Sequence, residues 1–372
     1  MLASKSPTPA TRLLIVGFSQ TGHMGSYLGA AARRLSIDYN VVDAANAEAR
    51  SRIGRSFYWH LCDKRPARLH RFGAQVLDSC VSTQRDVVLT TGRAPLDRWH
   101  IDRLRSLGIK VINYSTDDPW NLAQRAQWFL SALPAYDAVF TPRHANFGQF
   151  RRCGVRDVYY LPFAHDPEVH RPWPKDALAS APSDVIFVGG CDADRLPLIS
   201  ALIDQGLQVA LFGGYWGGHS KTRAFWRGIA DQNAIRSASA TARICLCLVR
   251  HANRDGHTMR SFEAAAIGGC VLAEDTADHR ELFGPNDHAV RYFKNIPEMV
   301  QQAKCLLGDL DARLRLSLQL RETFEARKHT YANRLATMLQ TLERQNVDDP
   351  GMAAETNDGR DNTALQPTLN FN

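Results

Sequence analysis

A polar, charged turn runs into an alanine-rich helix between residues 257 and 273, and the paired glycines Gly268 and Gly269 end this helix before an apolar strand. Free backbone N–H groups at a helix start favour an anion, and Arg260 adds a planar cation that matches phosphate oxygens. Glu263 lies one turn further on, where its carboxylate can accept hydrogen bonds from two neighbouring ribose hydroxyls. The segment predicts a phosphate and ribose site. The alternative is an amphipathic helix whose first turn carries a solvated arginine and glutamate.

A longer run, residues 253–263 followed by Gly268 and Gly269, resembles the C-terminal signature of the CgeB-like (spore-maturation-type) glycosyltransferases, a branch of the GT-B group. Four further stretches agree with that family in the same order, at residues 115–120, 136–141, 160–172 and 329–335. Colinear agreement is far more specific than any single motif. The resemblance implies an enzyme that uses a nucleotide-activated sugar, and it covers residues 85–340, with the first 80 residues similar only in outline.

The resemblance also implies roles for single residues. Members of the wider GT-B group often carry two acidic residues eight positions apart, the first for the sugar and the second for the ribose. Asp255 and Glu263 occupy those positions. Two departures leave the stereochemical outcome open: the first acid is Asp rather than Glu, and no lysine follows Arg195, where many retaining enzymes carry an arginine and lysine pair.

The other donor-site candidates follow predicted strands. Ligands bind at the carboxyl ends of the strands in doubly wound sheets, so the loops after Val188, Phe212 and Val249 should converge on the helix start. Gly189 and Gly190 leave room for the diphosphate. Tyr215 and Trp216 are either walls for the base or packing residues. His257 either contacts the donor or caps the helix. We expect the nucleotide-sugar site to comprise Gly189, Gly190, Arg195, Gly213, Tyr215, Asp255, His257, Arg260, Ser261 and Glu263.

Transfer from a nucleotide sugar needs charge stabilisation on the departing diphosphate. Arg260, Arg195 and the helix start could supply it without a metal, so we expect no metal site and no cofactor besides the donor substrate. An inverting route also needs a base from the acceptor side. The candidate catalytic residues are Asp117 and Asp118, which end a strand, and His23 in the first loop, although a simple turn also explains the two aspartates.

Short apolar strands alternate with helical spacers along most of the chain, which predicts parallel sheets covered on both faces. The first series of strands falls at residues 12–17, 41–43, 86–92, 110–114, 138–141 and 158–161. Prolines and charges interrupt the pattern at residues 167–182. It then restarts with strands at residues 184–190, 208–214, 244–249, 270–273 and 289–292.

We therefore predict an α/β protein of the GT-B fold, in which two Rossmann-like domains face a central cleft. The predicted parts are a flexible leader (1–11), an N-terminal acceptor domain (12–170), a C-terminal nucleotide-sugar-binding domain (171–328), a crossover helix (329–345) and a disordered tail (346–372). In the family that this chain resembles, the last helix returns to the first domain.

Composition fits an ordinary globular protein, with 44% hydrophobic and 22% charged residues in a chain of 372. No segment is apolar over the length of a membrane span, and the start has no apolar signal core, so we predict a cytoplasmic protein. The eight cysteines are scattered, which favours reduced thiols in the core over disulfides or a metal site.

The net charge of +7 owes much to residues 50–71, where cations alternate with bulky apolar side chains. Three interpretations remain open for this segment: a helical hairpin with a solvated basic face, peripheral contact with an anionic membrane on its inner face, or a surface that holds an anionic acceptor. Nucleic-acid binding is not expected, because no helix-turn-helix, finger or RNA-binding motif accompanies the charge.

We predict a glycosyltransferase that modifies a cell-surface polysaccharide, a glycolipid precursor or a protein. The alternatives are a catalytically degenerate nucleotide-binding or partner protein, and a nucleotide-sugar epimerase of the same fold. A nicotinamide-dependent oxidoreductase is disfavoured, because Gly17, Gly22 and Gly25 do not match G-x-G-x-x-G.

Overall fold

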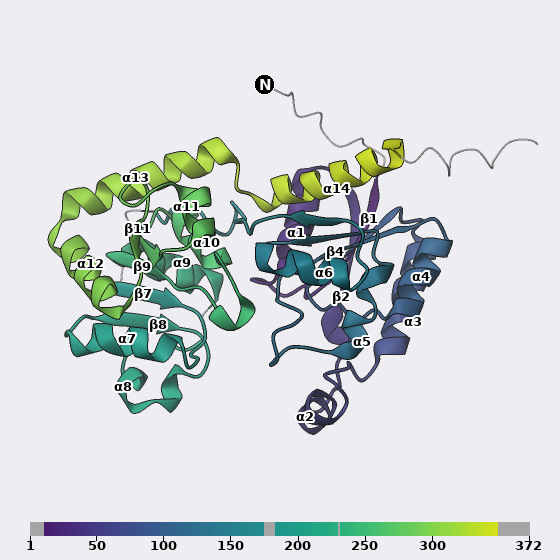
Figure 1. Ribbon diagram of the computed structural model, residues 1–372, viewed down its shortest axis with the longest axis horizontal. Helices are drawn as coiled ribbons and strands as arrows, with labels where there is room; N and C mark the ends of the chain where they lie inside the picture. The colour runs from purple at the N-terminus through teal and green to yellow at the C-terminus, as the bar shows by residue number, and fades with distance from the viewer. Residues whose placement is uncertain (1–10, 175–182, 230, 349–372) are drawn as a thin grey trace, which may run out of the picture.

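The computed structural model describes residues 11–174, 183–229 and 231–348. The predicted leader up to residue 10 and the predicted tail from residue 349 lie outside the described residues. Two α/β domains lie side by side, each built around its own sheet (Figure 1). The predicted fold class, two Rossmann-like domains, is confirmed.

The N-terminal sheet has six parallel strands in the order β2-β1-β3-β4-β5-β6. Every strand predicted for this domain is present, although β2 begins earlier than expected. The strands are β1 (Arg12–Gly17), β2 (Asp38–Asp43), β3 (Val87–Thr91), β4 (Lys110–Tyr114), β5 (Ala138–Thr141) and β6 (Val158–Tyr160). The helices are α1 (Met24–Arg34), α2 (Arg52–Leu61), α3 (Leu69–Ser82), α4 (Arg98–Ser106), α5 (Gln127–Leu130) and α6 (Phe147–Arg152).

Strand β1 shows why this sheet is covered on both faces. Its apolar run is fully buried, and successive side chains of a strand point to opposite faces. Leu13 and Ile15 join the core that includes α1, whereas Leu14 and Val16 join the core that includes α3 and α4. A continuous apolar run is therefore what this position in the sheet requires.

The C-terminal sheet has five parallel strands in the order β11-β10-β9-β7-β8. These are β7 (Val185–Val188), β8 (Val209–Phe212), β9 (Ile244–Cys247), β10 (Val271–Glu274) and β11 (Arg291–Phe293), each within two residues of a predicted strand. The helices are α7 (Arg195–Asp204), α8 (Ser220–Arg223), α9 (Gln232–Thr241), α10 (Met259–Ile267), α11 (Ala277–Phe283), α12 (Ile296–Gly308) and α13 (Leu310–Arg327).

The last helix, α14 (Tyr331–Asp348), leaves the C-terminal domain and packs on the N-terminal one (Figure 1). The ring of Tyr331 stacks on that of Tyr27 in α1, with centroids 5.2 Å apart. A helix was predicted here up to residue 345, and it continues to Asp348. The two domains are therefore connected by a helix as well as by the chain between their sheets.

Candidate active site

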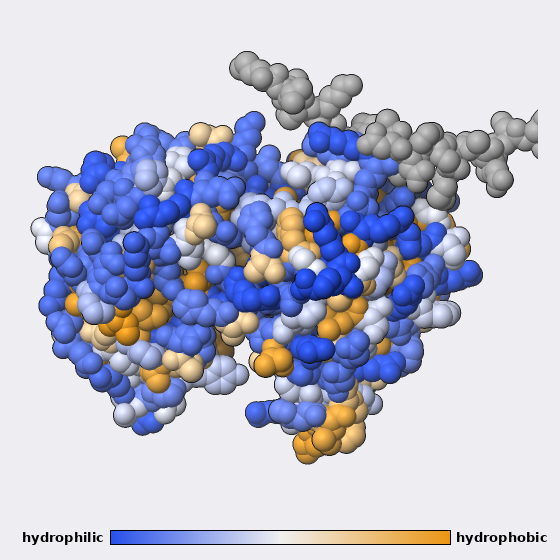
Figure 2. Space-filling view, viewed as in Figure 1, coloured by the Kyte–Doolittle hydropathy of each residue, from blue (hydrophilic) through white to orange (hydrophobic). Residues whose placement is uncertain are grey.

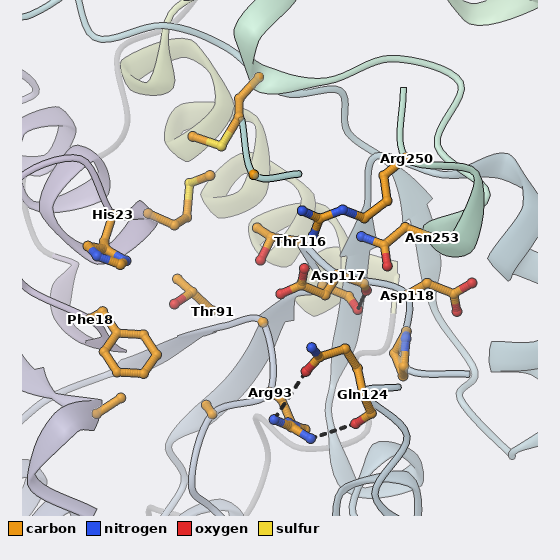
Figure 3. Close-up of a pocket in the computed structure, with 18 of the residues that line it drawn as sticks. Phe18, His23, Thr91, Arg93, Thr116, Asp117, Asp118, Gln124, Arg250 and Asn253 are labelled. Carbon is orange, nitrogen blue, oxygen red and sulfur yellow. Dashed lines mark hydrogen bonds between the residues drawn. The ribbon is translucent and has the colours of Figure 1, made fainter. Parts of the chain in front are cut away.

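A cavity of about 620 Å³ lies between the two domains and is lined by residues of both. Its walls follow the carboxyl ends of β1, β3 and β4 on one side and of β7 and β9 on the other, as expected for doubly wound sheets. Figure 3 shows Phe18 and His23 across the cavity from Arg250 and Asn253. The arrangement leaves room for a substrate that touches both domains.

The start of α10 is directed at this cavity. Thr258, Met259 and Arg260 are lining residues. Thr258 is extended at the N-cap, and its side chain accepts no hydrogen bond from a backbone N–H of the first turn, which also carries no acidic residue. Free N–H groups and the helix dipole therefore favour an anion at this wall.

Arg260 and Glu263 form an ion pair within the first turns of α10. The arginine side chain is 31% exposed and lines the cavity, whereas the glutamate side chain is only 4% exposed and does not. Glu263 Oε1 accepts no hydrogen bond from any residue that the structure describes, and His170 Nε2 lies 3.5 Å from it. A ribose can therefore reach Glu263 only if Arg260 moves aside.

Arg195 is the second cation of this wall and, unlike Arg260, it is buried. Its Nη1 donates to Gly190 O at 3.3 Å and its Nη2 to Leu248 O at 3.5 Å, while Asp192 lies 3.5 Å away. Burial lowers the pKa of its guanidinium. Its Nε is buried and has no partner among the described residues, while the residue itself lines the cavity.

The glycine loops after β7 and β8 differ in what they permit. Gly190 lines the cavity, and a Cβ atom there would only touch Gly214 O at 3.8 Å. Gly213 has a φ of +131°, and a Cβ there would lie 2.3 Å from Gly189 O. Gly189 also lines the cavity, but a Cβ there would lie 2.9 Å from the Phe187 ring, so only Gly190 leaves open space. Gly213 lets the two loops pack closely and does not line the cavity.

Two further predicted donor residues, Tyr215 and Ser261, do not line the cavity, and neither does Trp216. Tyr215 is 81% exposed. Trp216 is fully buried and donates from Nε1 to Gly189 O at 2.8 Å, so it is a packing residue. Ser261 is buried, with its Oγ 3.0 Å from His279 Nε2.

His257 is also buried away from the cavity. Its Nε2 accepts from the Phe163 N–H at 3.2 Å, so its proton lies on Nδ1, which is 3.2 Å from Asp278 Oδ2. Burial lowers the pKa of this imidazole. A contact with the donor is therefore not supported, and the residue joins the two domains instead.

The three predicted base candidates differ in what surrounds them. Asp118 is 1% exposed: its Oδ1 accepts from Asn146 and from the Trp120 N–H, and its Oδ2 accepts from Arg254 at 2.7 Å. With both oxygens occupied, Asp118 is not placed to take a proton. All three residues line the cavity, but only Asp117 and His23 are exposed.

Asp255 lines the cavity but is paired within the protein. Its Oδ1 accepts from Arg143 Nε of the N-terminal domain, and both side chains are nearly fully buried. Burial raises the pKa of the Asp255 carboxyl, and the adjacent Arg143 opposes that effect. This acid is therefore positioned by an ion pair between the domains.

Several lining cations were missed in the sequence. Arg93 follows β3, Arg143 follows β5 and Arg250 follows β9, each at a strand end where the rule for doubly wound sheets could have found it. Figure 3 shows Arg93 held by Gln124, whose main-chain O accepts at 2.5 Å. Arg55, Lys64 and Arg65 also line the cavity, from the basic segment at residues 50–71.

A metal-ligand geometry occurs elsewhere. His70, Asp97 and His100 have ligand atoms within 4.8 Å of one another, the one such group within the described ranges, and none of the three lines the cavity. Asp97 caps α4 by accepting from the His100 N–H, which accounts for the cluster without an ion. No described helix is long and apolar enough to cross a membrane.

Comparison with known proteins agrees with this geometry. Residues 195–340 match the family described as Glycosyl transferase-like. Among solved structures, the fold is similar to sucrose-phosphate synthase from Thermosynechococcus elongatus (TM-score 0.66, 14% identity, 91% of this chain and 99% of that one). It is also similar to Anabaena Alr3699/HepE in complex with UDP (TM-score 0.59, 10% identity, 90% and 100%). No curated protein matches the sequence.

These likenesses confirm the predicted GT-B fold over nearly the whole chain. The family match confirms the predicted class of enzyme, a glycosyltransferase, for the domain that it covers. The CgeB-like subtype stays a prediction.

Proposed function

We propose that this protein transfers a sugar from a nucleotide-sugar donor to an acceptor bound in the cleft. The observation that carries the proposal is the meeting of the α10 start, Arg260 and Arg195 at one wall of the cavity. Two cations and a helix start favour a diphosphate there without a metal. The Anabaena HepE structures with UDP, and with UDP and glucose, support a donor of this kind.

In this proposal the donor replaces an ion pair inside the protein. Arg260 turns from Glu263 to the diphosphate, and the freed carboxylate accepts hydrogen bonds from the ribose. The sugar then lies toward Asp255, which Arg143 holds in place. The bond between the anomeric carbon and the diphosphate oxygen breaks, the nucleoside diphosphate leaves with the electron pair, and an acceptor oxygen bonds to the carbon.

The acceptor oxygen must lose a proton during this step. Asp117 and His23 are the exposed candidates for the base on the N-terminal side.

We further propose the CgeB-like subtype, with a glycan, lipid-linked or protein acceptor. We propose that the protein acts at the cytoplasmic face of a membrane, with residues 50–71 in peripheral contact. The charge and exposure of that segment support this contact.

Thermal unfolding against a panel of nucleotide sugars tests the proposal. The panel contains UDP-, GDP-, dTDP- and CMP-sugars, the free nucleotides and NAD(H), because a ligand of the folded state raises the melting temperature. Arg260→Ala is the test variant, and Arg321→Ala, on the outer helix α13, is the matched control. Selective stabilisation by one nucleotide sugar, lost only in Arg260→Ala, is the expected result. Stabilisation by NAD(H) alone contradicts the proposal.

A further inference from the structure

The N-terminal side of the cavity carries an excess of positive charge. Arg55, Lys64, Arg65 and Arg93 line it, against the acids Glu48, Asp117 and Asp118, of which Asp118 is already paired with Arg254. None of these four cations forms an ion pair with a carboxylate in the described part of the chain. Their charge is available to an anion.

Three of these cations, Arg55, Lys64 and Arg93, donate to neutral main-chain oxygens, and the fourth, Arg65, contacts His70 Nε2 at 2.6 Å. Lys64 Nζ donates to Arg125 O at 3.1 Å, and Arg55 Nη1 donates to two main-chain oxygens, those of Ala49 and Arg50. A carbonyl oxygen positions a cation but leaves its net charge in place. The wall is therefore built for an anionic group, and it lies on the acceptor side, across from the predicted diphosphate site.

Trp59 of α2 holds this wall together. The Lys64 ammonium lies 5.9 Å from the centre of its ring and the Arg93 guanidinium 5.3 Å, which are distances of cation–π contacts. The ring thus attaches α2 to the edge of the cavity, although the helix has no buried residue of its own. Helix α2 therefore lines the cavity with one face while its other face is exposed to solvent.

The outer face of α2 carries an apolar stripe. Ile53, Phe57 and Leu61 are 85%, 50% and 73% exposed, and their spacing of four places them on one side of the helix. At about 100° per residue, this stripe points roughly opposite to the face of Arg55, Tyr58 and Trp59, which line the cavity. Figure 2 shows apolar side chains gathered at the lower tip of the N-terminal domain, where Figure 1 places α2.

The charge of the residues around this stripe indicates which surface it contacts. Residues 50–71 contain seven arginines and lysines and a single acid, Asp63. An exposed apolar stripe on a strongly basic segment suits the surface of an anionic membrane. A similar stripe on α13, at Leu310, Leu314 and Leu318, lies in a segment of mixed charge, residues 309–328, with five basic and four acidic residues.

We propose that the acceptor is a membrane lipid that carries a phosphate group. The stripe of α2 enters the lipid surface, and the lipid's phosphate binds the cations on the other face of the helix, within reach of the transferred sugar. This inference rests on the proposed function, because it names the acceptor of that same cleft. It explains why one helix combines an outward apolar face with an inward basic one.

Vesicle sedimentation tests the membrane contact with the full chain. The vesicles are pure phosphatidylcholine, or phosphatidylcholine with phosphatidylglycerol at roughly one third. The test variant is Ile53→Gln/Leu61→Gln, and the matched control is Leu314→Gln/Leu318→Gln, with melting temperatures to confirm folding. We expect binding to the anionic vesicles only, weakened about tenfold in the α2 variant and unchanged in the α13 variant. Equal loss in both variants, or no binding by the wild type, overturns the inference.

Thermal stabilisation by geranyl phosphate, geraniol and inorganic phosphate tests the acceptor chemistry. Geranyl phosphate should stabilise the wild type most, and Lys64→Ala/Arg65→Ala should lose that effect while keeping the response to the donor. Equal stabilisation by inorganic phosphate assigns the wall to a free anion, and equal stabilisation by geraniol assigns it to an apolar chain; either result overturns the lipid proposal. If the donor binds and geranyl phosphate does not, this inference alone fails. If no nucleotide sugar binds, the proposed function fails with it.

Discussion

Asp118 Oδ2 lies 2.7 Å from Arg254 Nη2, and this ion pair joins the N-terminal domain to the loop before α10. Asn121 Nδ2 donates to Asn253 Oδ1 at 2.6 Å beside it. The same loop carries Asp255, which pairs with Arg143. The N-terminal domain thus fixes the loop that the donor's sugar is proposed to touch.

Asp118→Asn tests whether this aspartate is a base or a partner of Arg254. Asparagine can still accept from the Trp120 N–H, but it loses the charge opposite the arginine. We expect Asp118→Asn and Arg254→Ala to reduce turnover by similar factors, and the double variant to be no worse than either one. Steady-state rates of the four proteins check this. Turnover abolished in Asp118→Asn and normal in Arg254→Ala would instead make Asp118 catalytic.

Removal of one member of the Arg143 and Asp255 pair should destabilise the fold. Asp255→Ala leaves the buried Arg143 charge without its partner, at a cost of about 3 kcal/mol in the free energy of unfolding. Replacing both residues with methionine should recover most of that loss. Urea unfolding measures each value. Equal stability of Asp255→Ala and the wild type would show that the pair does not form.

Acid should destabilise the protein through its buried histidines. Burial lowers the pKa of His279 to about 4, so the folded state keeps this imidazole neutral while an unfolded chain protonates it below about pH 6.5. Stability is therefore present above pH 6.5 and is lost as the pH falls toward 4, by about 2 kcal/mol at pH 5 for this group.

Melting temperatures at pH 7 and pH 5 check the histidine prediction. His279→Gln should lower stability at pH 7, because it disturbs the hydrogen bonds to Ser261 and Glu274, yet it should show a smaller further loss at pH 5. His219→Gln, at an exposed position, is the control. An unchanged loss at pH 5 in His279→Gln would assign the acid sensitivity to other groups.

Glu263→Gln separates the ribose contact from the phosphate contact. We expect about tenfold weaker binding of the nucleotide, because an amide oxygen accepts from hydroxyls more weakly than a carboxylate. Inorganic pyrophosphate, which has no ribose, should bind the variant at least as well as the wild type, since Arg260 is released from its pair. Competition binding with both ligands gives the two affinities. Parallel losses for both would place Glu263 at the phosphates.

The fold was predictable from the sequence because the core strands are apolar on both faces, and their pattern stops and restarts between the domains. The start of α10 was predictable because a polar turn, an alanine-rich run and two glycines follow one another in the sequence. What local patterns could not provide are partners distant in sequence: Asp118 faces Arg254, and His257 faces Phe163. Arg250 could have been found, since it follows β9 at the ligand-binding edge of the sheet.

In the proposed function, Arg260 binds the donor diphosphate at the start of α10. Calorimetric titration of the nucleoside diphosphate selected by the panel, into the wild type, Arg260→Ala and the control Arg321→Ala, tests it most directly. We expect a dissociation constant raised about tenfold or more in Arg260→Ala alone, because a charge-assisted phosphate contact is lost. Equal dissociation constants in all three proteins would contradict it.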